Sequence, residues 1–256
     1  MIDLIIEKKN EAYIYISAEP STLQELQDTF TFYADGYRFH PKYRSKIWDG
    51  KIKLLRMISR TKAELYFGLI DQVISFCKSR NYQYNIIGDI LNKEKPNPQE
   101  IKDFINNLRI SSKGQDIHPR DYQVKGFIDA ISNKRILLLS PTSSGKSLII
   151  YLICRYLNDK GLKGLIIVPN ISLVHQLSSD FSDYAAKTDW KEEDHVHKIF
   201  QGQDKYVKKS IILSTWQSLY QIKDNNYFKE FDFVITDEVH TAKARSEEHT
   251  SELQSH

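Results

Sequence analysis

The stretch ILLLSPTSSGKSLIIYLICRYL, residues 136–157, joins a short apolar run, a loop of small residues and a longer apolar run. The first run is typical of a buried strand, and the second is typical of a helix. Backbone N–H groups of a loop in this position, together with the helix N-terminus and its dipole, bind phosphate oxygens. The stretch therefore predicts a phosphate-binding loop in an α/β domain.

We expect this phosphate loop to bind ATP together with Mg²⁺. Lys146 would reach the β- and γ-phosphates, and the Ser147 hydroxyl would bind Mg²⁺. Ser140 stands where the general GxxxxGK[ST] pattern has its first glycine. The residues expected to contact the nucleotide are Pro141, Thr142, Ser143, Ser144, Gly145, Lys146 and Ser147.

A second apolar run, in FDFVITDEVH at residues 231–240, ends in two adjacent carboxylates. We expect Asp237 to hold Mg²⁺ through water and Glu238 to orient and deprotonate the attacking water. Ligands bind at the carboxyl ends of strands in open α/β sheets, which is where this acidic box lies. The alternative, an Asp-Glu pair that caps a helix, is weakened by the phosphate loop upstream.

The order of the predicted helices and strands along the chain indicates two domains. Residues 1–90 read as an α+β block, with strands at 2–6, 13–17, 37–40, 51–58, 64–69 and 84–87 and two helices. Residues 91–117 have the composition of a linker that contains one helix at 98–108. From 118 to 244 helices alternate with strands at 135–139, 165–168, 210–214 and 233–236, which predicts a parallel sheet covered on both faces.

Further blocks follow in a fixed order: HPRDYQ at 118–123, VPNISLVHQL at 168–177, KIFQGQ at 198–203 and STWQSL at 214–219. With the phosphate loop and the acidic box they give residues 118–244 the pattern of superfamily 2 helicases, which this segment resembles. The resemblance implies a RecA-like P-loop NTPase domain. Those helicases usually carry glycine at the position of Ser143, so the loop departs from their pattern there as well.

The resemblance also implies roles for individual residues. Arg120, Tyr122 and Gln123 would form the adenine pocket, with Gln123 bound to the adenine edge. His240 would couple the γ-phosphate state to the nucleic-acid side of the domain. The positions that would contact nucleic acid are Pro169, Asn170, Gln176, Gly202 and Thr215.

The N-terminal block contains a strongly basic segment. From Arg38 to Lys62 there are nine lysines and arginines and a single acidic residue, Asp49. Cations interleaved with aromatic residues are the footprint of nucleic-acid contact. The alternative is a solvated β-face whose aromatics, Trp48 above all, belong to the core. The expected DNA contacts are Arg38, Lys42, Arg44, Lys46, Trp48, Lys51 and Lys53.

We expect residues 245–256 to be a non-native tail, because RSEEHTSELQS is the in-frame translation of a widely used sequencing-library adapter. The TAKA at 241–244 follows the acidic box too closely to be the helicases' Ser/Thr-Ala-Thr block. The natural protein would then continue into a second RecA-like domain that carries an arginine finger. Such an arginine contributes about 10³–10⁵ in rate, so we expect this chain to bind ATP without efficient turnover.

The layout as a whole resembles phage recombination helicases, which implies an ATP-dependent DNA helicase or translocase acting on branched DNA or R-loops in recombination and repair. Its partners would be DNA and RNA–DNA hybrids, and it would be a monomer. Two alternatives remain: the motor subunit of a restriction-type endonuclease, and a fragment that only binds DNA and ATP. A P-loop kinase is disfavoured, because Glu238 stands beside Asp237 and the chain also has Gln123 and Thr215.

Composition fits a folded protein of the reducing cytoplasm. The two cysteines, Cys77 and Cys154, are far apart and have no ligand-like neighbours, which indicates neither a disulfide framework nor a zinc site. No apolar run approaches the roughly 20 residues that span a bilayer. We therefore expect a cytoplasmic protein that makes no membrane contact.

Overall fold

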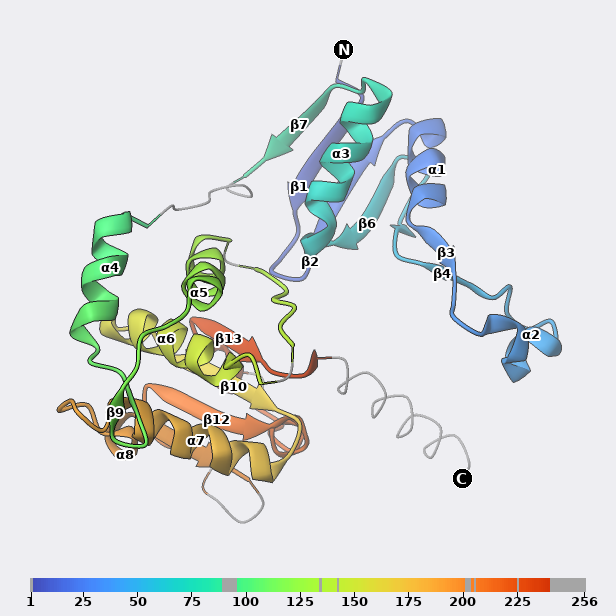
Figure 1. Ribbon diagram of the computed structural model, residues 1–256. Helices are drawn as coiled ribbons and strands as arrows, with labels where there is room; N and C mark the ends of the chain where they lie inside the picture. The colour runs from blue at the N-terminus through green and yellow to red at the C-terminus, as the bar shows by residue number, and fades with distance from the viewer. Residues whose placement is uncertain are drawn as a thin grey trace. The chain divides into compact units, whose positions relative to one another are not determined.

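The computed structural model describes residues 2–88, 96–133, 135–141, 143–200, 204, 206–224 and 226–239. The chain divides into two units, Met1–Asn92 and Lys93–His256, each with its own hydrophobic core (Figure 1). No helix among the described residues combines the length and apolar character needed to cross a bilayer. Cys77 and Cys154 are buried, and burial raises the pKa of both thiols.

The first unit is built on a five-stranded sheet in the order β5-β6-β2-β1-β7. β2 runs antiparallel to both β1 and β6, whereas β7 runs parallel to β1. Side chains alternate along β1 and β2, so that Leu4, Ile6, Ile14 and Ile16 are fully buried and form one core with residues of α1 and α3. The elements are β1 (Leu4–Lys8), β2 (Tyr13–Ala18), α1 (Pro20–Thr29), β5 (Arg56–Met57), β6 (Lys62–Tyr66), η2 (Phe67–Leu69), α3 (Ile70–Arg80) and β7 (Tyr84–Ile87).

Residues 31–53 form an extension of this unit, here called the arm. β3 (Thr31–Tyr33) and β4 (Lys51–Lys53) pair antiparallel and lead away from the sheet to η1 (Tyr37–Phe39) and α2 (Pro41–Arg44) (Figure 1). The predicted strand at 37–40 is wrong, since this segment forms a short 3₁₀ turn. The reason is local: Gly36 has a φ of 66° that reverses the chain, and Pro41 opens α2 with His40 as its cap.

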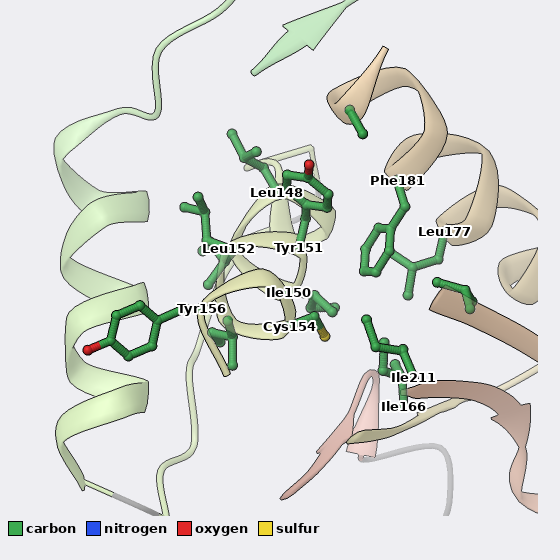
Figure 2. Close-up of a cluster of buried hydrophobic side chains, with 14 of the residues drawn as sticks. Leu148, Ile150, Tyr151, Leu152, Cys154, Tyr156, Ile166, Leu177, Phe181 and Ile211 are labelled. Carbon is green, nitrogen blue, oxygen red and sulfur yellow. The ribbon is translucent and has the colours of Figure 1, made fainter. Parts of the chain in front are cut away.

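The second unit holds a four-stranded parallel sheet in the order β11-β12-β10-β13. Helix α6 packs in the core of this unit, where Tyr151, Leu152 and Cys154 are fully buried (Figure 2). The prediction of an α+β unit followed by a parallel α/β unit is confirmed. The elements are α5 (Asp121–Asn133), α6 (Lys146–Asp159), β10 (Gly164–Val168), α7 (Ile171–Ala185), α8 (Glu192–His195), β11 (Val196–Ile199), β12 (Ile211–Thr215), α9 (Trp216–Tyr220), η3 (Tyr227–Glu230) and β13 (Phe233–Thr236).

In the segment predicted as a linker, 91–117, the helix predicted at 98–108 is confirmed, but from residue 98 onward the segment packs into the core of the second unit. α4 (Pro98–Asn107) is amphipathic, and Ile101, Leu108 and Ile110 are buried in the core of the second unit. The short hairpin of β8 (Ser111–Ser112) and β9 (Gln115–Asp116) is tied to α7, because the Ser111 hydroxyl donates to the Asp183 carbonyl at 2.7 Å. The polar, loop-like composition of the segment did not indicate that α4 has an apolar face, which packs against the second unit.

The strand predicted at 135–139 is absent, although its apolar residues suggested a buried strand. Leu137 is 70% exposed and Leu139 is 89% exposed, while Leu138 packs against the core. Within the described residues the sheet ends at β13, which pairs only with β10. An apolar sequence indicates that a segment is buried, but it does not show which strand the segment pairs with. No described strand pairs with residues 135–139, so the segment does not join the sheet.

Candidate nucleotide-binding site

The phosphate loop turns into α6 through two residues with left-handed backbone. Ser143 has a φ of 62°, and Gly145, the N-cap of α6, has a φ of 77°. A methyl group at Gly145 would also collide with the carboxamide of Gln123. Glycine is therefore required at 145 by both conformation and space, whereas Ser143 adopts a conformation that costs a residue with a Cβ about 1–2 kcal/mol.

The HPRDYQ block contacts the phosphate loop directly. The carbonyl oxygen of Ser144 accepts from the Tyr122 hydroxyl at 2.7 Å and from Gln123 Nε2 at 3.0 Å. Gln123 is 6% exposed, and its Oε1 accepts from the Arg120 backbone N–H at 2.8 Å. The carboxamide of Gln123 therefore connects the Arg120 backbone, at the start of α5, to the phosphate loop. Its contact with adenine stays a prediction.

The phosphate loop and the acidic box meet at Lys146. Its ammonium group forms an ion pair with Glu238, and this hydrogen bond, together with the charge of Asp237, raises the pKa of Lys146. The Asp237 backbone N–H donates to the Ile167 carbonyl at 2.9 Å, which fixes the box to β10. Lys146 and Glu238 side chains are 29% and 30% exposed, so an incoming phosphate could replace the carboxylate as the partner of Lys146.

Ser147, the expected Mg²⁺ ligand, is held by α7. Its Oγ lies 2.8 Å from the Tyr184 hydroxyl. Burial raises the pKa of Asp180, one turn earlier on α7, and a hydrogen bond to Ser147 opposes that rise. Asp180 and Tyr184 were missed by sequence reasoning, because nothing in the sequence of α7 shows which helix it packs against.

The predicted Mg²⁺ ligands suit that ion. Mg²⁺ prefers oxygen ligands and keeps several waters, so one or two protein oxygens besides the phosphates are enough. The hydroxyl of Ser147 and the carboxylate of Asp237 are oxygen donors on the two motifs that Lys146 joins. The lack of any cluster of three or more metal-ligating side chains among the described residues does not conflict with such a site.

The residues expected to contact nucleic acid in this unit differ in accessibility. Asn170 is exposed, and its Oδ1 caps α7 by accepting from the Leu173 N–H at 2.9 Å. Gln176 is exposed and Pro169 is partly exposed. Thr215 is 3% exposed, and its hydroxyl caps α9, so it could reach DNA only if that cap opened. Thr142, Gly202 and His240 lie outside the described residues.

In the first unit, the cations expected to bind DNA lie on the arm. Lys51 is partly buried, with its ammonium 5.4 Å from the centroid of the Tyr33 ring. Trp48 is partly exposed and is held in place, because its indole N–H donates to the Lys51 carbonyl at 2.9 Å and its ring meets the His40 ring edge to face. The remaining members are exposed: Arg38, Lys42, Arg44, Lys46 and Lys53.

We expect the Ser143→Gly variant to be more stable than the unaltered chain by about 1 kcal/mol, because glycine adopts positive φ without a steric penalty. Urea unfolding followed by circular dichroism measures this difference. The matched control is Gly145→Ser, which places a side chain at the other left-handed position and should destabilise the protein. Equal or lower stability of Ser143→Gly would show that the loop relaxes away from this backbone conformation.

The sequence of this chain matches two protein families and a relative from a bacteriophage. Residues 76–255 match the family described as type III restriction enzyme, res subunit, and residues 3–88 match the N-terminal domain of DNA helicase UvsW. The chain is 34% identical to the ATP-dependent DNA helicase uvsW of Enterobacteria phage T4 over 250 residues, which is 96% of this chain and 48% of that protein. It therefore spans about half the length of the curated relative that it matches.

Two solved structures agree with the fold. The crystal structure of T4 UvsW matches with a TM-score of 0.79 at 33% identity, over 93% of this chain and 48% of the other. The crystal structure of the UvsW helicase from bacteriophage T4 matches with a TM-score of 0.77 at 34% identity, over 93% of this chain and 83% of the other. The second unit has the RecA-like helicase fold that these structures share.

Proposed function

The chain belongs to the family of the type III restriction enzyme res subunit, within the superfamily 2 helicases, and we propose that it supplies the ATP-binding part of a DNA helicase or translocase that acts on branched DNA or R-loops. The observation that carries this proposal is the meeting of Lys146 with Glu238. It joins a phosphate loop and an acidic box that lie 92 residues apart in sequence. ATP and Mg²⁺ would be the cofactors, DNA the partner and the host cytoplasm the location.

The Lys146–Glu238 pair suggests an order of events at the site. When ATP binds, its β- and γ-phosphates would take over Lys146, and the freed Glu238 carboxylate could accept a proton from the attacking water. Ser147 and Asp237 would hold Mg²⁺, which would neutralise charge on the phosphates. The ion pair would therefore keep Glu238, the proposed base, bound to Lys146 until ATP binds.

We further propose that these 256 residues alone bind ATP but turn it over slowly. An arginine supplied from a second domain contributes about 10³–10⁵ in related phosphoryl transfers. The charged groups described around Lys146 are the carboxylates of Asp237 and Glu238, which would hold the lysine and Mg²⁺ but would not supply that positive charge. Turnover by the isolated chain at the rate of a complete helicase would refute this proposal.

The main competing function is a motor subunit of a restriction-type endonuclease, which the family description favours. Against it, residues 3–88 match the N-terminal domain of a DNA helicase. The sequence of this block also offers no recognisable nuclease constellation. A third possibility is a module that binds DNA and ATP without moving along it.

The test is to express the reading frame past residue 244 and to measure strand displacement from forked DNA and from an R-loop. A helicase should displace strands with ATP and should fail with a non-hydrolysable analogue. Cleavage of the DNA would favour the endonuclease subunit. Binding with neither displacement nor cleavage would favour the binding module.

A further inference from the structure

Two large apolar side chains of the arm are strongly exposed to solvent. Phe39 is 76% exposed and Ile47 is 77% exposed, more than any other phenylalanine or isoleucine described in the first unit. Their chain neighbours lie together, since the His40 and Trp48 rings meet edge to face at 5.2 Å. Phe39 and Ile47 therefore belong to the same part of the arm, here called the apolar tip.

The arm beneath the apolar tip is held by its own packing. Tyr37 stacks on Tyr33 at 4.6 Å and meets Tyr43 edge to face at 4.9 Å. Gly50, with a φ of 77°, leaves no room for a side chain against the Tyr37 ring. The Ile47 N–H donates to the Lys42 carbonyl at 2.9 Å. Because Tyr33, Tyr37 and Tyr43 already pack on one another, Phe39 and Ile47 are not needed for these contacts.

Positive charge lies beside Ile47 of the apolar tip. An open pocket of about 790 Å³ is lined by Arg38, Arg44 and Lys46 together with Ile47 and Trp48. Asp49 also lines it, and its carboxylate accepts from the Lys51 backbone N–H at 3.0 Å. Three cations against one carboxylate favour an anionic ligand, and apolar side chains within such a site favour one that also offers a flat apolar surface. Nucleic acid combines both properties.

We propose that Phe39 and Ile47 form a wedge that inserts between base pairs at the branch point of duplex DNA, while the cations beside them bind the flanking phosphates. This inference rests on the proposed function, because it requires that the arm bind DNA. Apolar side chains inserted between base steps unstack and kink the duplex in other DNA-binding proteins. A branch point is the favourable place, since a base pair there has already lost stacking on one side and costs less to open.

The experiment uses the 256-residue chain and a three-way DNA junction with 2-aminopurine next to the branch, a base that fluoresces more when it is unstacked. Saturating protein should raise the fluorescence of the junction several-fold more than that of an unbranched duplex with the same label. The double variant Phe39→Ala, Ile47→Ala should lose this rise. Its affinity, measured by anisotropy, should fall by less than about threefold, because phosphates supply most of the binding energy.

Two further variants make the result specific. Ile58→Ala with Ile87→Ala removes two side chains of the same unit that are 49% and 47% exposed but lie outside the arm, and it should leave the fluorescence rise intact. Phe39→Leu with Ile47→Leu keeps an apolar tip and should restore most of the rise. Thermal unfolding of each variant shows whether it is folded.

The outcomes separate the wedge from the function on which it rests. Binding without a fluorescence rise, or a rise that the double alanine variant retains, would overturn the wedge and leave DNA binding in place. That is also the result expected if the apolar tip serves contacts with another protein. Failure of the unaltered chain to bind either DNA would contradict the proposed DNA-binding role itself.

Discussion

The Glu238→Gln variant should lose ATP hydrolysis by about 10²–10⁴-fold, because a neutral amide cannot take the proton of the attacking water. ATP binding should be retained and should even tighten by up to about fivefold. The reason is that Lys146 forms an ion pair with Glu238. A partly exposed ion pair contributes up to about 1 kcal/mol, which ATP must overcome when it displaces Glu238. Hydrolysis is measured in the longer protein that we propose, expressed from the natural reading frame past residue 244, and binding of a fluorescent ATP analogue is measured in the 256-residue chain.

Glu230→Gln is the matched control for this variant. Glu230 is also paired with a lysine, since its carboxylate lies 2.6 Å from Lys163 Nζ, but it lies outside the acidic box. This control should change neither hydrolysis nor ATP affinity. Retained hydrolysis in Glu238→Gln would refute its role as the base, and weaker ATP binding would refute the competition between Glu238 and ATP for Lys146.

Replacing Lys42, Arg44 and Lys46 together with alanine should weaken DNA binding by about 10²-fold or more at 0.1 M salt. Each phosphate contact contributes about 0.9 to the slope of log K against log salt, so the loss of three should flatten that slope by about 2.7. All three side chains are exposed, so their truncation should leave the fold of the arm intact. Anisotropy titrations of a labelled duplex over a range of salt concentrations measure both quantities.

The control here is the triple alanine variant of Lys8, Lys78 and Arg80. These are exposed cations of the same unit outside the arm, so the net charge falls equally. An equal effect of the two triple variants would mean that the total charge of the unit matters and that the arm does not. An unchanged slope in the arm variant would remove the arm from the DNA interface.

The sequence predicted those parts of the molecule that local patterns determine. The alternation of helices and apolar strands identified the α/β unit and most of its sheet. The spacing of Lys146 and Glu238 in two separate motifs predicted their common site, and the ion pair between them agrees with that prediction. These features follow from periodicity and from motif chemistry, both of which are visible without a structure.

Features that depend on which surfaces meet were not predictable. Tyr122 and Gln123 can donate hydrogen bonds to the phosphate loop only because α5 lies beside that loop. Tyr184 can contact Ser147 only because α7 packs on α6. The buried Ile101 was hidden in a segment of linker-like composition. The exposure of Phe39 and Ile47 was equally invisible, because an aromatic and basic sequence is compatible with either core or surface.

The unpaired side of β13 has a consequence for the chain in solution. Among the described residues β13 has β10 as its one neighbour, and Val234 on it is 57% exposed. Open strand edges with exposed apolar side chains are templates on which a further strand can be added. Two copies of the chain could add strands to one another there, and the apparent unfolding temperature would then rise with protein concentration.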